Sequence, residues 1–227
     1  MAGLLEDELE LLRAGAAAGG VRLTGSQEVI LSSFLDLLLV WSRRYRLVGT
    51  RDRSVLITHH LADSLVPAGV LGDQGSIIDI GSGAGLPGIP LAVVRPDLRF
   101  VLLDSRRVPC GFMREAVRRL GLANVGVREA RVEAVAGELE SSGGEFDATI
   151  SRAWANLSPF LQVSARLLKA GGVAVAMKGP GLERELAACG EELDLFERSD
   201  DTEYSLPGKL GPRRLLAIFR YRGRDSS

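Results

Sequence analysis

A glycine-rich segment at residues 77–92 constrains the fold of this chain more than any other feature. It reads Ile-Ile-Asp-Ile-Gly-Ser-Gly-Ala-Gly-Leu-Pro-Gly-Ile-Pro-Leu-Ala. This is a short apolar run, a loop with repeated glycines, and an apolar stretch that suits a helix. An apolar strand that enters a glycine-rich turn at a helix start is the usual way to bring backbone close to a nucleotide. Glycine is needed because a Cβ would block the ligand or forbid a positive φ.

Two acidic residues bear on which cofactor this loop accepts. Asp79 lies inside the apolar run, just before the first glycine. Its carboxylate favours a ligand with a free ammonium, such as S-adenosylmethionine (AdoMet), whereas a dinucleotide pyrophosphate offers it no partner. Asp104 lies about 20 residues beyond the loop, where an acid reaches the hydroxyl pair of a ribose. The pattern Asp79-x-Gly81-x-Gly83-x-Gly85 therefore predicts AdoMet binding.

A nicotinamide cofactor is the competing interpretation of the same loop. Gly83-Ala-Gly85-Leu-Pro-Gly88 satisfies the pattern G-x-G-x-x-G, which is a nicotinamide fingerprint. The register of this match is shifted, because Gly81 is the glycine that directly follows the strand. Nothing later in the sequence resembles a hydride-transfer site. A nicotinamide-dependent oxidoreductase is therefore the less favoured alternative.

The chain divides into a helical beginning and an α/β remainder. Helices are expected at about 4–13, 27–45 and 52–66, with a small-residue break at 15–20 and a cap at Thr24 or Ser26. The predicted strands are 76–80, 99–103, 125–129, 146–150, 172–177 and 214–219. The helices between them are predicted near 88–94, 108–120, 132–140, 156–169 and 181–189. This alternation predicts a mostly parallel, doubly wound, Rossmann-like sheet, with a helical N-terminal extension at 1–70 and the cofactor domain at 71–227.

Composition excludes several other classes. The 227 residues are 46% hydrophobic and 25% charged, as in ordinary globular proteins, and the net charge of −1 means that any RNA contact needs a local patch. Cys110 and Cys189 are far apart, which argues against a disulfide framework and fits a reducing cytoplasm. The only histidines, His59 and His60, are adjacent and have no ligand cluster, so no metal is expected. We also expect no secretory signal and no membrane contact.

Charged residues follow the predicted strands at the edge where open parallel sheets bind their ligands. They are Asp104, Arg131, Glu133, Arg152 and Lys178. Four of them also have an ordinary structural interpretation: a helix cap for Asp104, a favourable helix N-terminus for Glu133, and solvated surface charge for Arg152 and Lys178.

Several motifs, in this order, resemble those of the RsmG family, also called GidB. The glycine segment with its Gly-Leu-Pro-Gly-Ile-Pro-Leu core is similar to the signature of that family. The other matching blocks are His60-x-x-Asp63-Ser64, Leu102-Leu103-Asp104-Ser105, Arg131-Val132-Glu133, Ile150-Ser151-Arg152-Ala153, Met177-Lys178-Gly179 and Arg213-Arg214-Leu215-Leu216-Ala217-Ile218. The resemblance covers about residues 28–220.

This resemblance implies a class I AdoMet-dependent methyltransferase with a small helical N-terminal extension. Members methylate N7 of a guanosine in 16S ribosomal RNA, so the implied partner is that RNA or the small ribosomal subunit, in the cytoplasm, and we expect a monomer. AdoMet would lie over the loop from Gly81 to Leu86, with its adenine near Val132 and Glu133. Arg152 matches a family position at the cofactor and substrate site.

Two departures from the family pattern keep other functions open. Val108-Pro109 stands where the family usually has a Lys-Arg pair, and Arg46 stands where it often has an asparagine. Cofactor binding stays expected, but a methyltransferase with another acceptor and a non-catalytic, ribosomal RNA-binding relative remain alternatives. Two local basic groups suit RNA or, equally, a solvated surface. They are Arg43, Arg44, Arg46, Arg51 and Arg53 around Trp41 and Tyr45, and Arg213, Arg214, Arg220, Arg222 and Arg224.

The chemistry of N7 methylation needs no general base, because guanine N7 carries a lone pair and no proton. Catalysis then consists of alignment and of the electrostatics of the site. We assign catalytic contacts to Arg152 and Lys178, since each can donate to guanine O6 or to phosphate oxygens. His60 lies before the sheet, where it can reach the site from the helical extension or serve as an ordinary polar residue of a helix.

Overall fold

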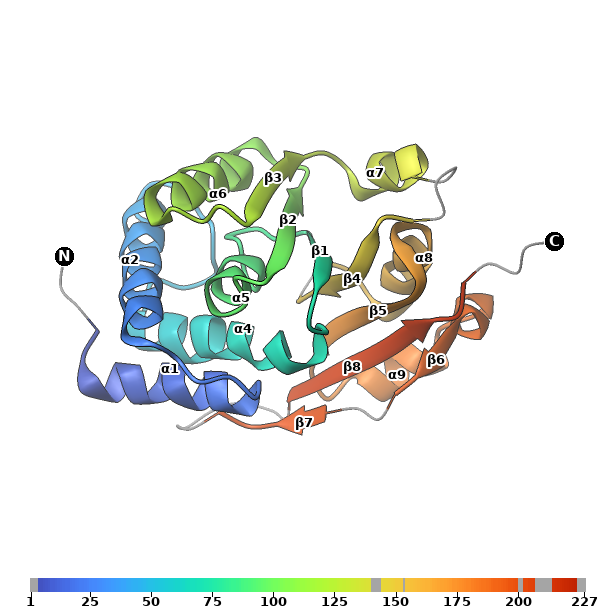
Figure 1. The fold of residues 1–227 in the computed structure, drawn as a ribbon, viewed down its shortest axis with the longest axis horizontal. Coiled ribbons are helices and arrows are strands. Elements are labelled where there is room, and N and C mark those ends of the chain that lie inside the picture. Colours follow the sequence, from blue (N-terminus) through green and yellow to red (C-terminus); the bar gives the residue numbers. More distant parts are fainter. Residues whose placement is uncertain (1–3, 140–143, 153, 200–201, 207–213, 224–227) are drawn as a thin grey trace.

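A central sheet organises the molecule (Figure 1). The computed structural model describes residues 4–139, 144–152, 154–199, 202–206 and 214–223. Within these ranges the sheet order is β3-β2-β1-β4-β5-β8-β6, and β7 pairs with β8. The strands are β1 Gly75–Ile80, β2 Leu98–Asp104, β3 Val125–Glu129, β4 Phe146–Ser151, β5 Leu168–Lys178, β6 Phe196–Arg198, β7 Thr202–Tyr204 and β8 Arg214–Tyr221. The predicted mostly parallel, doubly wound sheet with helices on both faces is confirmed.

The strand order reverses between β1 and β4. Strands β1 to β5 pair in parallel, whereas β8 is antiparallel to β5. Asp79 on β1 lies opposite Leu102 on β2 and Ile150 on β4. In open α/β sheets the ligand crevice lies at such a reversal, outside the carboxyl ends of the strands. The glycine loop after β1 therefore sits at the edge where a cofactor is expected.

Helices cover both faces of the sheet because alternate residues of each strand are apolar on both sides. One face carries α1 Glu6–Ala18, α2 Gly25–Ser42, a helical run at 53–70, α5 Gly88–Val94 and α6 Arg107–Leu120. The other carries α7 Val132–Leu139, α8 Leu157–Leu167 and α9 Leu182–Ala187. On β1, Ile77 packs with the first set and Ile78 with the second.

The N-terminal helices differ from prediction in one respect. Helix α1 continues through Gly15 to Ala18, so the expected break begins only at Gly19. A Cβ on Gly15 would collide with the backbone of Ala62, so this glycine permits close helix packing rather than a turn. The predicted cap is confirmed, because Thr24 Oγ1 accepts a hydrogen bond from the Gln27 amide at 3.3 Å.

The helical run at 53–70 is irregular. It consists of α3 Arg53–Val55, the π-helical segment η1 Leu56–Ala62, α4 Asp63–Leu65 and the 3-10 segment η2 Val66–Val70. A π-turn inside a helix is uncommon and often occurs at a functional site. Here it carries His59 and His60.

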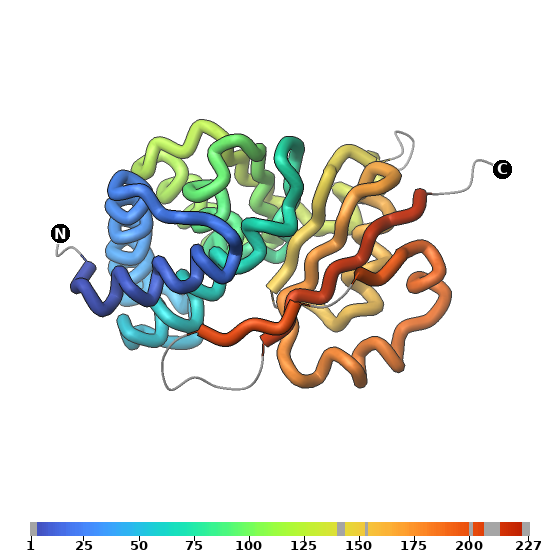
Figure 2. The backbone as a smooth tube through the Cα atoms, turned by 60° about the horizontal axis from the view of Figure 1, so that its bottom comes forward, coloured from blue at the N-terminus to red at the C-terminus, as the bar shows by residue number. Residues whose placement is uncertain are grey.

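Strands β6 and β7 were not predicted. Each has only three residues, Phe-Glu-Arg and Thr-Glu-Tyr, which is too short for a periodic signal. They flank β8, and Figure 2 shows β7 and the start of β8 passing close to the N-terminal helices. Asp63 of α4 accepts hydrogen bonds from Tyr204 of β7 and Arg214 of β8. Strands β7 and β8 therefore tie the helical run to the sheet.

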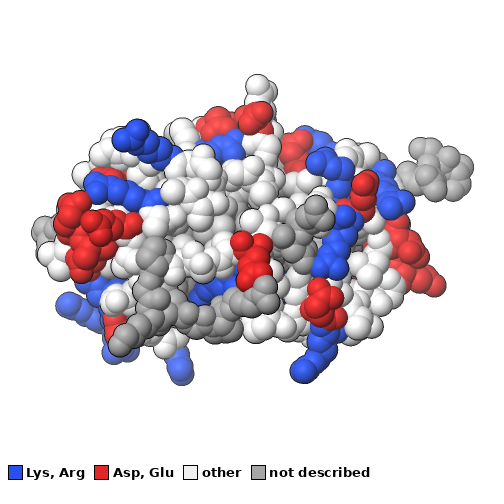
Figure 3. Space-filling model, turned by 90° about the horizontal axis from the view of Figure 1, so that it is seen from below, with Lys and Arg blue, Asp and Glu red and all other residues white. Residues whose placement is uncertain are grey.

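The surface of the molecule carries both signs of charge. On the face shown in Figure 3, Lys and Arg side chains are interspersed with Asp and Glu, as the net charge of −1 suggests. Among the helices that the structure describes, none has both the length and the apolar character needed to span a membrane.

Candidate active site

The glycine loop has the backbone geometry that the sequence predicts. Gly81, Gly83 and Gly85 have φ of 70°, 56° and 73°, a region that disfavours residues with a Cβ. A Cβ on Gly81 would lie 2.6 Å from the Trp154 ring. The Gly81 amide donates to Leu103 O at 2.8 Å, which anchors the loop on β2. The three glycines therefore let the loop turn tightly over the end of the sheet.

A cavity of about 360 Å³ opens beside this loop. Its walls come from the ends of β1, β2 and β3, the start of α7 and the segment after β4. The lining residues include Gly81, Asp104, Arg131, Val132, Glu133 and Trp154. The cavity thus brings together four of the predicted cofactor residues, Gly81, Asp104, Val132 and Glu133. Trp154 was not predicted, and its position after the Ile-Ser-Arg block was the only available signal.

Asp104 is held in place by two groups. Its Oδ2 accepts from the Gly83 amide at 3.0 Å and from Arg106 Nη2 at 3.0 Å, while Oδ1 accepts from Arg106 Nε at 3.0 Å. Burial alone would raise the pKa of Asp104, but the hydrogen bonds and charge of Arg106 hold this pKa below its ordinary value. The Arg106 side chain is 65% exposed, so it is free to swing away from the carboxylate.

Asp79 and Arg152 form a pair of buried groups with unused hydrogen-bonding capacity. Asp79 is 1% exposed, and its Oδ2 accepts from the Gly88 amide at 2.9 Å. Its Oδ1 is buried without a partner, and so is Nη1 of Arg152, which follows the neighbouring strand β4. Burial raises the pKa of Asp79 to about 6, although the charge of Arg152 opposes this rise.

Orphaned buried polar atoms are costly, so such a pair indicates a missing ligand with an acceptor and a donor. An α-amino acid has both, in its carboxylate and its ammonium. The two residues do not line the cavity. They lie at the ends of β1 and β4, where the sheet order reverses.

Arg152 contacts the helical run at 53–70. Its Nη2 is hydrogen-bonded to His60 Nδ1, and its Nη1 lies 3.9 Å from Asp63 Oδ2. Asp63 is fully buried and accepts from Tyr204 Oη at 2.7 Å and Arg214 Nη1 at 2.6 Å. The sequence singled out His60-x-x-Asp63-Ser64 as a motif but did not reveal these partners, because Arg152, Tyr204 and Arg214 are remote in the chain.

Lys178 has internal partners. Its Nζ donates to Glu185 Oε2 at 2.7 Å and to Ala155 O at 3.0 Å, and its side chain is 12% exposed. Glu185 also accepts from the Leu157 amide at 2.7 Å. In this geometry Lys178 joins α8, α9 and the segment after β4. A catalytic role for it stays a prediction.

The remaining predicted cofactor residues lie in the loop itself. Gly83 and Gly85 shape its backbone, and Leu86 is 7% exposed and packs into the core between the sheet and α5 and α6. Their contacts to a cofactor therefore stay predictions. Among the described residues, no group of three or more His, Cys, Asp and Glu side chains could hold a metal ion.

The two predicted basic groups separate into internal and surface residues. Arg53 is paired with Glu8 at 2.7 Å and with Asp36 at 3.4 Å, and Arg214 with Asp63. The exposed arginines that follow α2 are Arg43, Arg44, Arg46 and Arg51. Arg44 lies over the Tyr45 ring, 5.6 Å from its centroid. Arg213, Arg224 and Ala153 lie outside the described residues.

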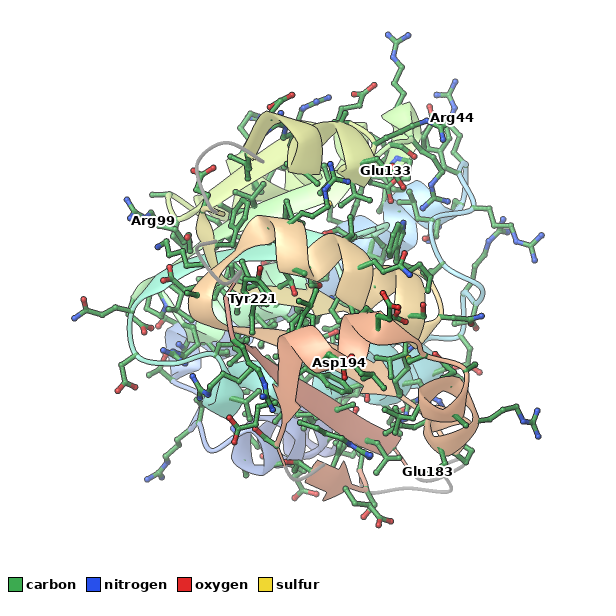
Figure 4. All side chains as sticks on the ribbon, turned by 90° about the vertical axis from the view of Figure 1, so that its right-hand side faces the viewer. Arg44, Arg99, Glu133, Glu183, Asp194 and Tyr221 are labelled. Atoms are coloured by element: carbon green, nitrogen blue, oxygen red, sulfur yellow. The ribbon has the colours of Figure 1, made fainter. Side chains whose placement is uncertain are left out.

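The end of α2 lies on the side of the candidate site. Figure 4 shows Arg44 toward the same side of the molecule as Glu133. Glu133 lies in the first turn of α7, which follows the carboxyl end of β3. Trp41 of α2 also packs edge-on against Phe112 of α6, with ring centroids 5.5 Å apart. Arg44 therefore lies on the ligand side of the sheet.

This chain is similar in sequence to known proteins of one family. Residues 27–210 match the family model described as "GidB: rRNA small subunit methyltransferase G". A "Ribosomal RNA small subunit methyltransferase G" from Neisseria gonorrhoeae is 43% identical over 213 residues, which cover 93% of this chain and 98% of the relative.

Two solved structures show the same fold at low sequence identity. Cofactor-bound Rv0187 from MTB has a TM-score of 0.60 at 20% identity, covering 86% of this chain and 90% of that one. M. jannaschii TYW2 in complex with AdoMet has a TM-score of 0.54 at 16% identity, covering 73% and 76%.

Proposed function

The chain belongs to the rRNA small subunit methyltransferase G (GidB) family, and from this we propose that it transfers a methyl group from AdoMet to N7 of a guanosine in 16S ribosomal RNA. The proposal includes AdoMet as cofactor and the small ribosomal subunit or its RNA as partner. It also includes a cytoplasmic location, where that RNA is found, and a monomeric protein with a helical extension at 1–70.

The buried pair Asp79 and Arg152 is the observation that carries this proposal. AdoMet ends in an α-amino acid, whose ammonium suits the free Oδ1 of Asp79 and whose carboxylate suits the free Nη1 of Arg152. Charge-assisted hydrogen bonds of this kind are short and strong. A nicotinamide dinucleotide has no such group, so the pair favours AdoMet over the oxidoreductase alternative.

The cavity beside the loop suits the adenosine half of the cofactor. Asp104 lies on its wall and is the acceptor for the ribose hydroxyls, while Val132 and Glu133 lie where the adenine is expected. The Asp104 carboxylate becomes fully available once Arg106 moves away, which its exposure allows. The residues present therefore fit both ends of AdoMet.

The reaction places few demands on proton transfer. The cofactor supplies an electrophilic methyl group on a sulfonium, and guanine N7 attacks with its lone pair. The chain has to align the two reactants, exclude water and stabilise charge. In our proposal Asp79 and Arg152 fix the amino-acid end of the cofactor, Asp104 fixes the ribose, and the exposed arginines after α2 hold phosphates of the RNA.

The test is methyl transfer from labelled AdoMet to three acceptors: small ribosomal subunits that lack the modification, large subunits, and buffer without RNA. We expect label in small-subunit RNA only. A thermal-shift comparison adds the cofactor class, with AdoMet and not NAD raising the unfolding temperature. Stabilisation by NAD alone would refute the proposal. AdoMet binding without label in RNA would favour another acceptor or a non-catalytic relative.

A further inference from the structure

Arg152 is held by a neutral acceptor on one side and by a distant carboxylate on the other. The neutral acceptor is His60 Nδ1, which is hydrogen-bonded to Arg152 Nη2. The carboxylate is Asp63, whose Oδ2 lies 3.9 Å from Arg152 Nη1, beyond hydrogen-bonding range. Because a guanidinium has only donors, His60 Nδ1 must be the acceptor, and the ring proton then resides on Nε2.

The surroundings keep His60 uncharged. The charged and titratable groups around it are Arg152, Arg214, Asp63 and the adjacent His59. Burial is the largest effect, and together with the positive charge of Arg152 it lowers the pKa of His60 to about 3. His60 therefore accepts a hydrogen bond near neutral pH and contributes no charge.

The negative charge of Asp63 is already engaged elsewhere. Tyr204 and Arg214 donate to its two oxygens at 2.7 and 2.6 Å. His60 thus orients Arg152 without adding a negative charge, while the Arg152 Nη1 is left buried with no hydrogen-bond partner. A carboxylate in place of His60 would hold the same guanidinium but consume its charge.

The backbone that carries His60 is itself fixed. His60 lies in the π-helical segment η1, and Ser64 Oγ donates to its carbonyl at 2.5 Å. Asp63 follows directly at the start of α4 and is tied to strands β7 and β8. The His60 side chain therefore connects the helical extension to Arg152, the residue that follows β4.

We propose that His60 is a positioning residue for Arg152: a neutral acceptor that fixes the guanidinium while leaving its charge and Nη1 available to the carboxylate of a bound ligand. The inference rests on the proposed function, because it takes that carboxylate to be the amino-acid end of AdoMet. It assigns a specific task to the helical extension, which the cofactor fold itself does not require.

The test compares two ligands on the full chain by titration calorimetry. S-adenosylhomocysteine keeps the amino-acid end, and 5′-methylthioadenosine lacks it. His60→Phe keeps a ring but removes the acceptor, and we expect it to weaken S-adenosylhomocysteine roughly 10-fold to 100-fold while methylthioadenosine binds as to the wild type. His60→Asn places its side-chain oxygen near the position of Nδ1 and should bind both ligands within about threefold of the wild type.

Matched controls separate positioning from folding. His59→Phe changes the neighbouring ring, whose Nδ1 is hydrogen-bonded to Arg214 Nη2 at 3.4 Å, and should leave both affinities unchanged. The proposal would be overturned if His60→Phe weakened the binding of both ligands equally, or if it bound S-adenosylhomocysteine with wild-type affinity. It would also be overturned if His60→Asn did not bind S-adenosylhomocysteine within about threefold of the wild type. A wild-type chain that binds neither ligand would instead refute the proposed function, before any variant is compared.

Discussion

Replacing Asp79 by asparagine should change how the stability of the ligand-free protein depends on pH. The free energy of unfolding of Asp79→Asn, compared with that of the wild type, should be higher at neutral pH than at acidic pH. The carboxyl group is fully buried, and burial raises its pKa from an ordinary 3.8 to about 6. Between these values the folded protein keeps a proton that the unfolded chain loses. The group therefore contributes stability that is fully present below pH 3.8 and is lost as the pH rises through 6.

The size of this effect follows from the pKa. Each pKa unit corresponds to about 1.4 kcal/mol, so a rise from 3.8 to about 6 corresponds to about 3 kcal/mol. Asparagine keeps an acceptor for the Gly88 amide and does not titrate. Part of this effect falls below pH 4, so the free energy of unfolding of the variant minus that of the wild type should increase by about 2.4 kcal/mol from pH 4 to pH 7.5.

Urea unfolding of both proteins across this range measures the difference, in which the other titrating groups cancel. Asp147→Asn is the matched control. Hydrogen bonds from Ser76 and Lys169 outweigh burial and hold the pKa of Asp147 below its ordinary value of 3.8. The stability that Asp147 contributes is therefore lost only at lower pH, and its difference should stay nearly constant from pH 4 to pH 7.5. If the difference in free energy of unfolding between Asp79→Asn and the wild type does not vary with pH, the pKa of Asp79 is not raised in the ligand-free protein and the reasoning is refuted.

Three further substitutions test other parts of the site. Gly81→Ala places a Cβ 2.6 Å from the Trp154 ring at a φ of 70°, so calorimetry should show that AdoMet binding is lost. The control Gly111→Ala has open space around its Cβ. It should bind AdoMet as the wild type does, and its free energy of unfolding in urea should rise by up to about 1 kcal/mol. Arg106→Ala frees the Asp104 carboxylate from an exposed ion pair, which is worth about 0.2–1 kcal/mol, so AdoMet should bind up to about fivefold tighter; weaker binding would mean that Arg106 itself holds the cofactor. Arg152→Ala should lower methyl transfer at least about 100-fold with a native circular-dichroism spectrum, and turnover near the wild-type rate would contradict its role.

Much of the fold could be predicted because its signals are local. The six main strands and the helices after them have apolar periodicity, and the structure places each of them within a few residues of its predicted bounds. The exceptions have physical reasons. Strands β6 and β7 are too short to show a period, and the glycine at 15 was taken for a helix break although it serves close packing against Ala62.

The site could be predicted only in part, because its loop is local and its charge partners are not. Gly81, Asp104, Val132 and Glu133 all follow strands and do line one cavity. The partners of Arg152 come from segments about 90 residues upstream, and no sequence pattern indicates which of many polar residues meet across such a distance. For the same reason the pairing of Lys178 with Glu185 could not be foreseen.

Identification of the methylated nucleoside tests the central claim most directly. Labelled AdoMet and the wild-type chain are incubated with small ribosomal subunits that lack the modification, and the RNA is digested to nucleosides and separated by chromatography. The account predicts label in 7-methylguanosine. Label in any other nucleoside, or no label from a protein that binds AdoMet, would contradict it.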